Sequence, residues 1–200
     1  MTTKVFAYGS ISEGMIHFNK VSAFVETHKP GWITGTAYRL KVGYPVVLNQ
    51  GEDLIPGQIL ELKTSDILMA MLDEFFGFSP FQPEKSLYLR EQVKVAHEGG
   101  SEMEEVWTYF LNPRKLPSTA VVIAGGNWMQ DMKNLPLMTE KLNPRQRSYI
   151  QKLGAATGRD IIPINDLALY RELMGLELIV DKGRRLALSK LGQEVYRYLG

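Results

Sequence analysis

Cysteine is absent from the 200-residue chain. Without thiols the protein can form neither a disulfide nor a thiolate metal site, and it has no cysteine nucleophile. Histidine is scarce as well, and the three histidines, His17, His28 and His97, are scattered without the spacing of metal ligands. We therefore expect a protein with no metal site and no cofactor.

Long apolar runs are also lacking. No apolar stretch approaches the roughly 20 residues that a membrane span requires. The first residues, Met1 to Phe6, enter a strand pattern without the basic segment and cleavage site of a secretory signal. The expectation is no contact with a membrane and, by default, a cytoplasmic location, with which the missing cysteines agree.

The composition is otherwise ordinary, with 44% hydrophobic and 22% charged residues, as in soluble globular proteins. The net charge of +1 is unevenly shared, because residues from Asn143 onward include ten Lys and Arg against six Asp and Glu. This asymmetry indicates a different role for the C-terminal part. It is too small to argue nucleic-acid binding by itself.

The first two thirds of the chain predict several strands and one helix. Period-two alternation or short apolar runs ended by turn residues predict strands at residues 5–8, 34–40, 46–48, 58–62, 87–95 and 105–111. Ser65 is a good N-cap for a helix over residues 66–76, which has a wide apolar stripe. One helix among many short strands predicts an α+β fold with a small mixed sheet or barrel.

Short motifs in this region follow one another in a fixed order, and the ordered set resembles the gamma-glutamylcyclotransferase-like family. Single members of the set are common, whereas the order is specific, and it extends from Val5 to Trp128. The motifs are Tyr8-Gly9-Ser10-Ile11, Gly43-Tyr44-Pro45, Pro56-Gly57, Leu72-Asp73, Tyr88-Leu89-Arg90, Trp107-Thr108-Tyr109 and Gly126-Asn127-Trp128.

The first motif has a physical logic of its own, because a strand that ends in Gly9-Ser10 exposes successive backbone N–H groups that suit a carboxylate. The resemblance implies a small ligand, a gamma-glutamyl or related amide or carboxylate. Arg90 could pair with its carboxylate, or instead form a salt bridge with Asp73 or Glu74. The expected ligand-binding residues are Tyr8, Gly9, Ser10, Ile11, Tyr44, Tyr88 and Arg90.

The resemblance also implies a reaction in which the α-amine of the substrate attacks its own γ-carbonyl and releases 5-oxoproline. A general base must first remove a proton from the ammonium group, and in the family this base is a glutamate in a Leu-Asp-x-x-Glu-Gly arrangement. Here that position is Phe76. Asp73 and Glu84 are the candidate substitutes, so enzymatic activity is left open.

The chain from Asn143 predicts a helix, a second helix, a hairpin and a last helix. Asn143, Asn165 and Ser189 are the expected caps. The run from Leu169 to Gly192 resembles the second half of a winged-helix module. We therefore expect two domains, residues 1–135 and 143–200.

The expected wing carries Lys182, Arg184 and Arg185, where winged helices touch nucleic acid. The alternative is a helical cap or a homodimer surface, and the modest positive charge favours it over nucleic-acid binding. Two functions are therefore weighed against the ligand-binding one. They are a non-enzymatic regulator that senses a ligand and contacts protein or DNA, and a purely structural subunit.

Overall fold

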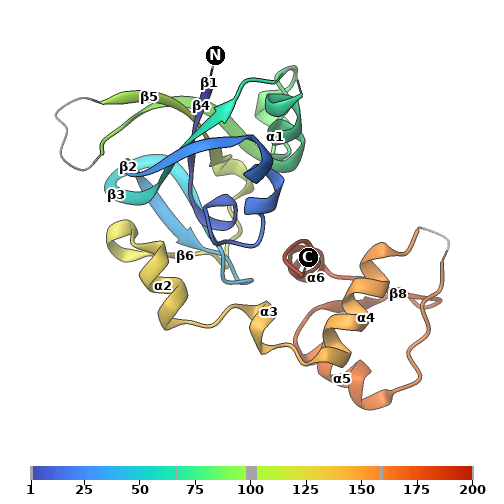
Figure 1. Ribbon diagram of the computed structural model, residues 1–200. Helices are drawn as coiled ribbons and strands as arrows, with labels where there is room; N and C mark the ends of the chain where they lie inside the picture. Colours follow the sequence, from blue (N-terminus) through green and yellow to red (C-terminus); the bar gives the residue numbers. More distant parts are fainter. Residues whose placement is uncertain (1, 66, 98–102, 158–159, 200) are drawn as a thin grey trace. The chain divides into compact units, whose positions relative to one another are not determined.

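The computed structural model describes residues 2–65, 67–97, 103–157 and 160–199 (Figure 1). The chain divides into two compact units, Met1–Leu40 with Tyr44–Asn134 and Lys41–Gly43 with Leu135–Gly200. We call them the N-terminal unit and the C-terminal unit. Both contain helices and strands, which confirms the expected α+β class.

A mixed sheet forms the body of the N-terminal unit. Within the described residues it has six strands in the order β4-β5-β1-β3-β2-β6. Neighbouring strands are antiparallel except β1 and β5, which are parallel. The strands are β1 (Thr2–Ala7), β2 (Val25–Arg39), β3 (Pro45–Lys63), β4 (Tyr88–Val95), β5 (Glu104–Leu111) and β6 (Val121–Val122).

Two α-helices and several single 3-10 turns accompany this sheet. The α-helices are α1 (Leu68–Phe76) and α2 (Trp128–Asn134). The 3-10 turns are η1 (Gly9–Ile11), η2 (Phe18–Lys20), η3 (Ser22–Phe24), η4 (Pro83–Lys85), η5 (Pro113–Lys115) and η6 (Ala124–Gly126). The start of α1 was predicted at Asp66, which lies outside the described residues, and its N-cap is Ile67 rather than Ser65.

The prediction of short strands was wrong for β2 and β3, which run for 15 and 19 residues. Pro56-Gly57 does not open a new strand, because both residues pair with β2 inside the continuous β3. A Cβ at Gly57 would lie 2.4 Å from the Phe6 ring, so glycine allows the backbone to pass over that side chain. The residues at 25–33 were missed, since they are mostly exposed and lack an apolar alternation.

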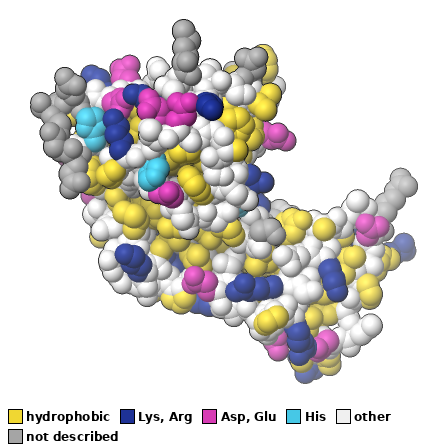
Figure 2. All heavy atoms as spheres, in the orientation of Figure 1, with side chains coloured by type: hydrophobic (Ala, Val, Ile, Leu, Met, Phe, Trp, Pro, Cys, Tyr) yellow, Lys and Arg dark blue, Asp and Glu magenta, His cyan; other side chains and the backbone are white. Residues whose placement is uncertain are grey.

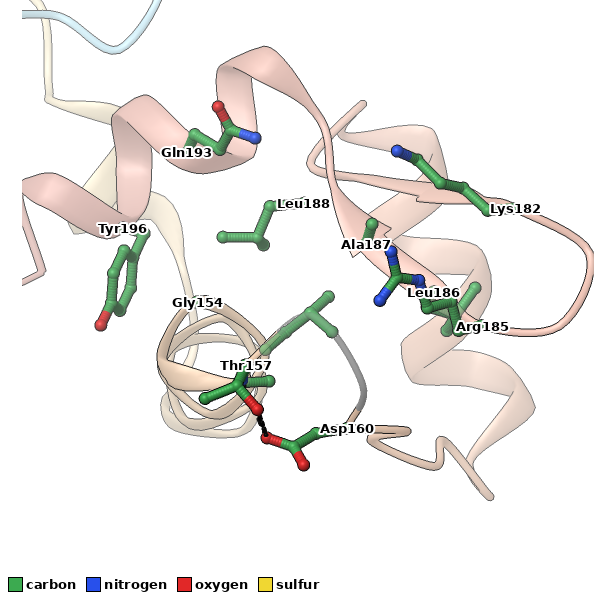
Figure 3. Close-up of a pocket in the computed structure, with 12 residues that line it drawn as sticks. Gly154, Thr157, Asp160, Lys182, Arg185, Leu186, Ala187, Leu188, Gln193 and Tyr196 are labelled. Carbon is green, nitrogen blue, oxygen red and sulfur yellow. Dashed lines mark hydrogen bonds between the residues drawn. The ribbon is translucent and has the colours of Figure 1, made fainter.

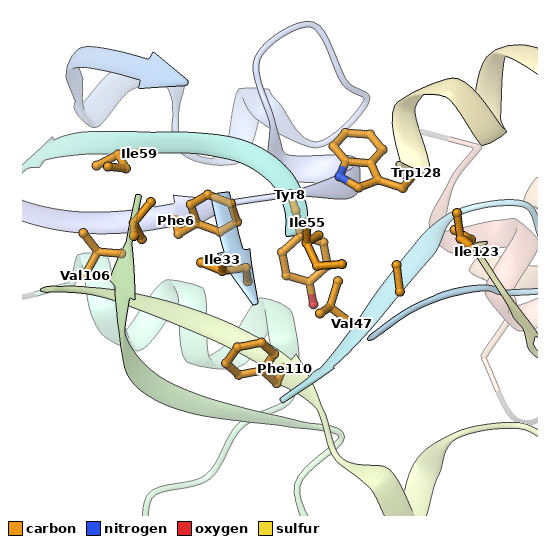
Figure 4. Packing of buried hydrophobic residues seen from close by; sticks show 12 residues of the cluster. Phe6, Tyr8, Ile33, Val47, Ile55, Ile59, Val106, Phe110, Ile123 and Trp128 are labelled. Carbon is orange, nitrogen blue, oxygen red and sulfur yellow. The ribbon is translucent and has the colours of Figure 1, made fainter. Parts of the chain in front are cut away.

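The side chains of β1 alternate between two buried clusters on opposite sides of the sheet. Phe6 and Tyr8 join a cluster with Ile33, Phe110 and Trp128 (Figure 4). Val5 and Ala7, which alternate with Phe6 and Tyr8 along the chain, join a second cluster that includes Leu68 and Leu72 of α1. The apolar stripe of α1 is therefore buried as predicted, with Met71 and Phe75 half-buried at its border.

The C-terminal unit shows the expected order of helix, helix, hairpin and helix, with one short helix in front. Asn143 and Ser189 cap their helices as predicted, whereas the second helix is capped by Asp166 and not by Asn165. The elements are α3 (Met138–Lys141), α4 (Pro144–Ala155), α5 (Leu167–Gly175), β7 (Ile179–Asp181), β8 (Leu186–Leu188) and α6 (Lys190–Arg197).

Acidic and basic side chains are interspersed over both units on the face that Figure 2 presents, and neither sign gathers into one stripe. In the N-terminal unit, for example, Lys4 and Lys29 both pair with Glu104. Among the described helices, none has the length and apolar character needed to cross a membrane.

Candidate functional site

The turn after β1 lies against Pro45, the first residue of β3. Gly9 has a φ of +64° and begins η1, and a Cβ on it would lie 3.2 Å from Cγ of Pro45. Tyr8, Ile11 and Tyr44 are buried, while Ser10 is half-buried. Two of the motifs that were far apart in the sequence are thus side by side, and the left-handed conformation at Gly9 disfavours other residues there.

Aromatic rings surround Phe76, the position at which the resemblance implies a glutamate. The ring of Phe76, the last residue of α1, stacks on that of Tyr109 with centroids 4.1 Å apart and an angle of 12°. Its edge contacts are Tyr88 at 5.1 Å and Phe75 at 5.0 Å. Ile11 belongs to the same buried cluster, so the end of α1 and the turn after β1 share one region.

Tyr109 connects this region to both neighbouring motifs. The hydroxyl of Tyr8 donates a hydrogen bond of 2.7 Å to the backbone carbonyl of Tyr109. The hydroxyl of Tyr109 donates one of 2.7 Å to Oδ1 of Asp73. Burial, followed by the hydrogen bond to Asp73 and its negative charge, holds the pKa of Tyr109 above its usual range. Tyr109 therefore stays protonated and acts as a donor.

Asp73 is held by Arg90 as well as by Tyr109. Nη1 of Arg90 lies 3.0 Å from Oδ1 and 2.8 Å from Oδ2 of the carboxylate. The guanidinium carbon also lies 5.1 Å from the centre of the Phe78 ring and 5.2 Å from that of Trp107. Of the two interpretations of Arg90, the structure shows the salt bridge with Asp73.

These contacts bear on which group could serve as a base. Phe76 has no atom that accepts a proton, and the Asp73 carboxylate already accepts hydrogen bonds from two side chains. Glu84 is exposed on η4, where its backbone carbonyl accepts a hydrogen bond from Asn112. The surroundings of Phe76 are consequently apolar and aromatic.

Sequence reasoning missed Ser12, which directly follows η1. Its hydroxyl is buried and has no hydrogen-bond partner among the described residues. The signal available in the sequence was its place one residue after the Tyr8-to-Ile11 motif. A buried hydroxyl without a partner is costly, so it is a group that a bound ligand could satisfy.

The candidate nucleic-acid residues Lys182, Arg184 and Arg185 lie in the turn between β7 and β8, and all three are exposed. The turn is fixed by bonds from the Lys182 N–H to the Arg185 carbonyl and from the Gly183 N–H to Oδ1 of Asp181. It belongs to the C-terminal unit, whereas the aromatic region belongs to the N-terminal unit. Across the residues that the structure describes, no cluster of three or more His, Asp or Glu could hold a metal ion.

Comparison with known proteins places residues 5–130 in the family described as gamma-glutamyl cyclotransferase, AIG2-like. An AIG2-like protein of Mus musculus is similar in structure, with 14% identity, a TM-score of 0.46, and coverage of 58% of this chain and 80% of its own. A protein of Arabidopsis thaliana shares 26% identity with a TM-score of 0.45, over 58% of this chain and 72% of its own.

The protein YkqA of Bacillus subtilis matches over 94% of this chain and 81% of its own, at 16% identity and a TM-score of 0.49. No curated protein matches the sequence.

Proposed function

Because the chain belongs to the AIG2-like gamma-glutamyl cyclotransferase family, we propose that its N-terminal unit binds a small gamma-glutamyl-type amide or carboxylate without catalysing the family's reaction at an appreciable rate. The observation that carries the proposal is the stacking of Phe76 on Tyr109, at the position where the resemblance implies the catalytic glutamate.

The chemistry of the reaction explains why this position decides the activity. The α-amine of the substrate attacks the γ-carbonyl, a new C–N bond closes the ring of 5-oxoproline, and the old amide C–N bond breaks to release an amine. The attacking nitrogen must lose a proton, and the departing amine must gain one. A carboxylate at position 76 would shuttle this proton, whereas a phenyl ring has no lone pair to accept it.

A substitute base is poorly supported by the contacts. Ionised Asp73 is paired with Arg90 and accepts a hydrogen bond from Tyr109, so a proton transferred to it would disrupt both interactions. Glu84 is exposed to solvent. General-base catalysis requires a base within hydrogen-bond reach of its proton, so either substitute would have to give up its present contacts or move toward the substrate.

Binding has separate support. Successive N–H groups in the turn of Gly9, Ser10 and Ile11 suit the carboxylate of a ligand. The buried hydroxyl of Ser12 adds a polar group beside it. The half-buried rings of Phe76 and Tyr88, with Tyr109 buried against Phe76, supply an aromatic surface for the apolar part of an amide. An apolar surface with a few polar groups is typical of small-molecule sites.

Calorimetric titration of the whole chain with gamma-glutamyl-alanine tests the proposal, with 5-oxoproline measured in the same mixture. We expect saturable heat and little 5-oxoproline. Ser10→Trp, which adds bulk at the turn, should abolish the heat, and Ser22→Trp on exposed η3 is the matched control. Absent binding to the wild type would refute the binding role, and rapid release of 5-oxoproline would refute the loss of the base.

A further inference from the structure

A pocket of about 390 Å³ lies entirely within the C-terminal unit (Figure 3). Its walls come from the end of α4, the residues that follow it, the β7–β8 hairpin and α6. This volume falls in the range of small-molecule sites, toward the small end. The lining residues on which the inference rests are Leu153, Asp160, Lys182, Arg185, Leu188 and Tyr196.

The walls are held together by close backbone contacts. A Cβ at Gly154 would lie 2.4 to 2.6 Å from atoms of the Tyr196 ring, so this glycine allows α6 to approach α4. The Ser189 hydroxyl caps α6 by accepting the Gly192 N–H at 2.9 Å, and it donates to the Glu177 carbonyl. Ile179 pairs with Leu188 across the hairpin. The pocket is therefore built by the fold rather than by loose surface side chains.

The pocket joins an apolar wall to two basic groups. Leu153 is buried and Leu188 half-buried, and in Figure 3 Leu188 lies between Tyr196 and Arg185. The basic groups are Lys182 and Arg185, both on the hairpin. An anion with an apolar body would contact both kinds of group at once.

One acidic side chain, Asp160, also lines the pocket. The backbone N–H and the hydroxyl of Thr157 donate to its Oδ2 at 2.8 and 2.7 Å. These hydrogen bonds from Thr157, first that of the hydroxyl, lower the pKa of Asp160, which is therefore ionised at neutral pH. Two cations and one anion leave the lining with a single excess positive charge, which matches a singly charged ligand better than a doubly charged phosphate ester.

We propose that this pocket is a second binding site, which takes a small carboxylic acid with an apolar or aromatic body. Lys182 and Arg185 bind the carboxylate, Arg185 through the planar guanidinium that suits two oxygens. Leu153, Leu188 and the Tyr196 ring contact the body of the ligand. The site is independent of the N-terminal unit, so it neither needs nor replaces the ligand proposed there.

Arg184 provides a matched control on the same hairpin. It is exposed like Lys182 and carries the same charge, but it lines a different hollow with Ile161 and Tyr170 and not this pocket. If the ligand were held only by the general positive charge of the hairpin, its affinity would depend on Arg184 as much as on Lys182. If it binds in the pocket, its affinity depends on Lys182 and not on Arg184.

The test is titration of the ¹⁵N-labelled 200-residue chain with phenylacetate, its neutral analogue phenylacetamide and a mixed-sequence DNA duplex. Phenylacetate should shift the amide signals of residues 153–157, 186–188 and 193–196, and phenylacetamide should bind far more weakly. Lys182→Met should weaken phenylacetate binding by about tenfold or more, because a charge-assisted hydrogen bond is lost. Arg184→Met should leave the affinity unchanged.

Four results would overturn the proposal. The first is no shift of the amide signals at about 10 mM phenylacetate, a concentration that detects even weak binding, and the second is binding of phenylacetamide as tight as that of phenylacetate. The third is an equal loss of phenylacetate affinity in Lys182→Met and Arg184→Met. The fourth is a set of shifts confined to the N-terminal unit. Salt-sensitive duplex binding that both substitutions weaken, without phenylacetate binding, would identify the hairpin as a nucleic-acid contact instead.

Discussion

Arg90→Met should destabilise the N-terminal unit through a defined set of lost contacts. The side chains of Arg90 and Asp73 are only 21% and 14% exposed. Breaking a buried pair costs about 3–5 kcal/mol and an exposed one less than about 1 kcal/mol, so this partly buried pair should contribute about 2 kcal/mol. The contacts with the Phe78 and Trp107 rings add about 1 kcal/mol. The expected loss of unfolding free energy is about 3 kcal/mol.

Urea unfolding followed by tryptophan fluorescence measures this loss selectively. All three tryptophans, Trp32, Trp107 and Trp128, lie in the N-terminal unit, so the signal reports that unit. Arg114→Met is the matched control, since Arg114 is exposed on η5, and its effect should stay within about 0.5 kcal/mol. An Arg90→Met loss no larger than that of the control would refute the view that Asp73 is fixed by a mostly buried ion pair.

Two further predictions concern a glycine and a pH dependence. Gly154→Ala should lower the unfolding free energy of the C-terminal unit by about 1–3 kcal/mol, because the added methyl group would overlap with Tyr196. Gly175→Ala, with open space around it, should be neutral or slightly stabilising. Unfolding followed by circular dichroism compares the two variants, and equal effects would contradict the close packing of Gly154 on Tyr196. Hydrogen bonds from Lys29 and Lys4 lower the pKa of Glu104 from its ordinary 4.5. The ionised Glu104 side chain therefore stabilises the folded protein fully above pH 4.5, and this stabilisation is lost as the pH falls through the lowered pKa. The deficit of Glu104→Gln in urea unfolding should therefore shrink in acid, and a deficit that is constant from neutral to acidic pH would count against this ion pair.

Local signals in the sequence were sufficient for elements whose stabilising contacts are short in range. Examples are the Asn143 and Ser189 caps, the apolar stripe of α1 and the β7–β8 hairpin. Each depends on residues only a few positions apart in the sequence. The length of β3 could not be predicted in this way, because the residues around Pro56 and Gly57 are held by pairing with β2. Such pairing depends on distant residues and leaves no local pattern.

In the candidate site, too, contacts between residues distant in the sequence could not be predicted. The sequence predicted Tyr8 to Ile11 as a turn, which the structure shows, and Phe76 as the altered position, which stays a prediction. It left Arg90 between two interpretations, and only the spatial neighbours of its guanidinium decided for Asp73. The stacking of Phe76 on Tyr109 and the burial of the Ser12 hydroxyl arise from packing between segments far apart in the chain. No spacing rule predicts such contacts.

The most direct measurement of the central claim is the initial rate of 5-oxoproline release from gamma-glutamyl-alanine by the wild type and by Phe76→Glu. Phe81→Glu is the matched control, because it adds the same carboxylate at a side chain that is 92% exposed. A positioned base typically contributes about 10²–10⁴-fold to a rate, and we expect Phe76→Glu to regain at least about tenfold of this while Phe81→Glu regains none. A wild-type rate already equal to or above that of Phe76→Glu would contradict the claim that the missing glutamate limits catalysis.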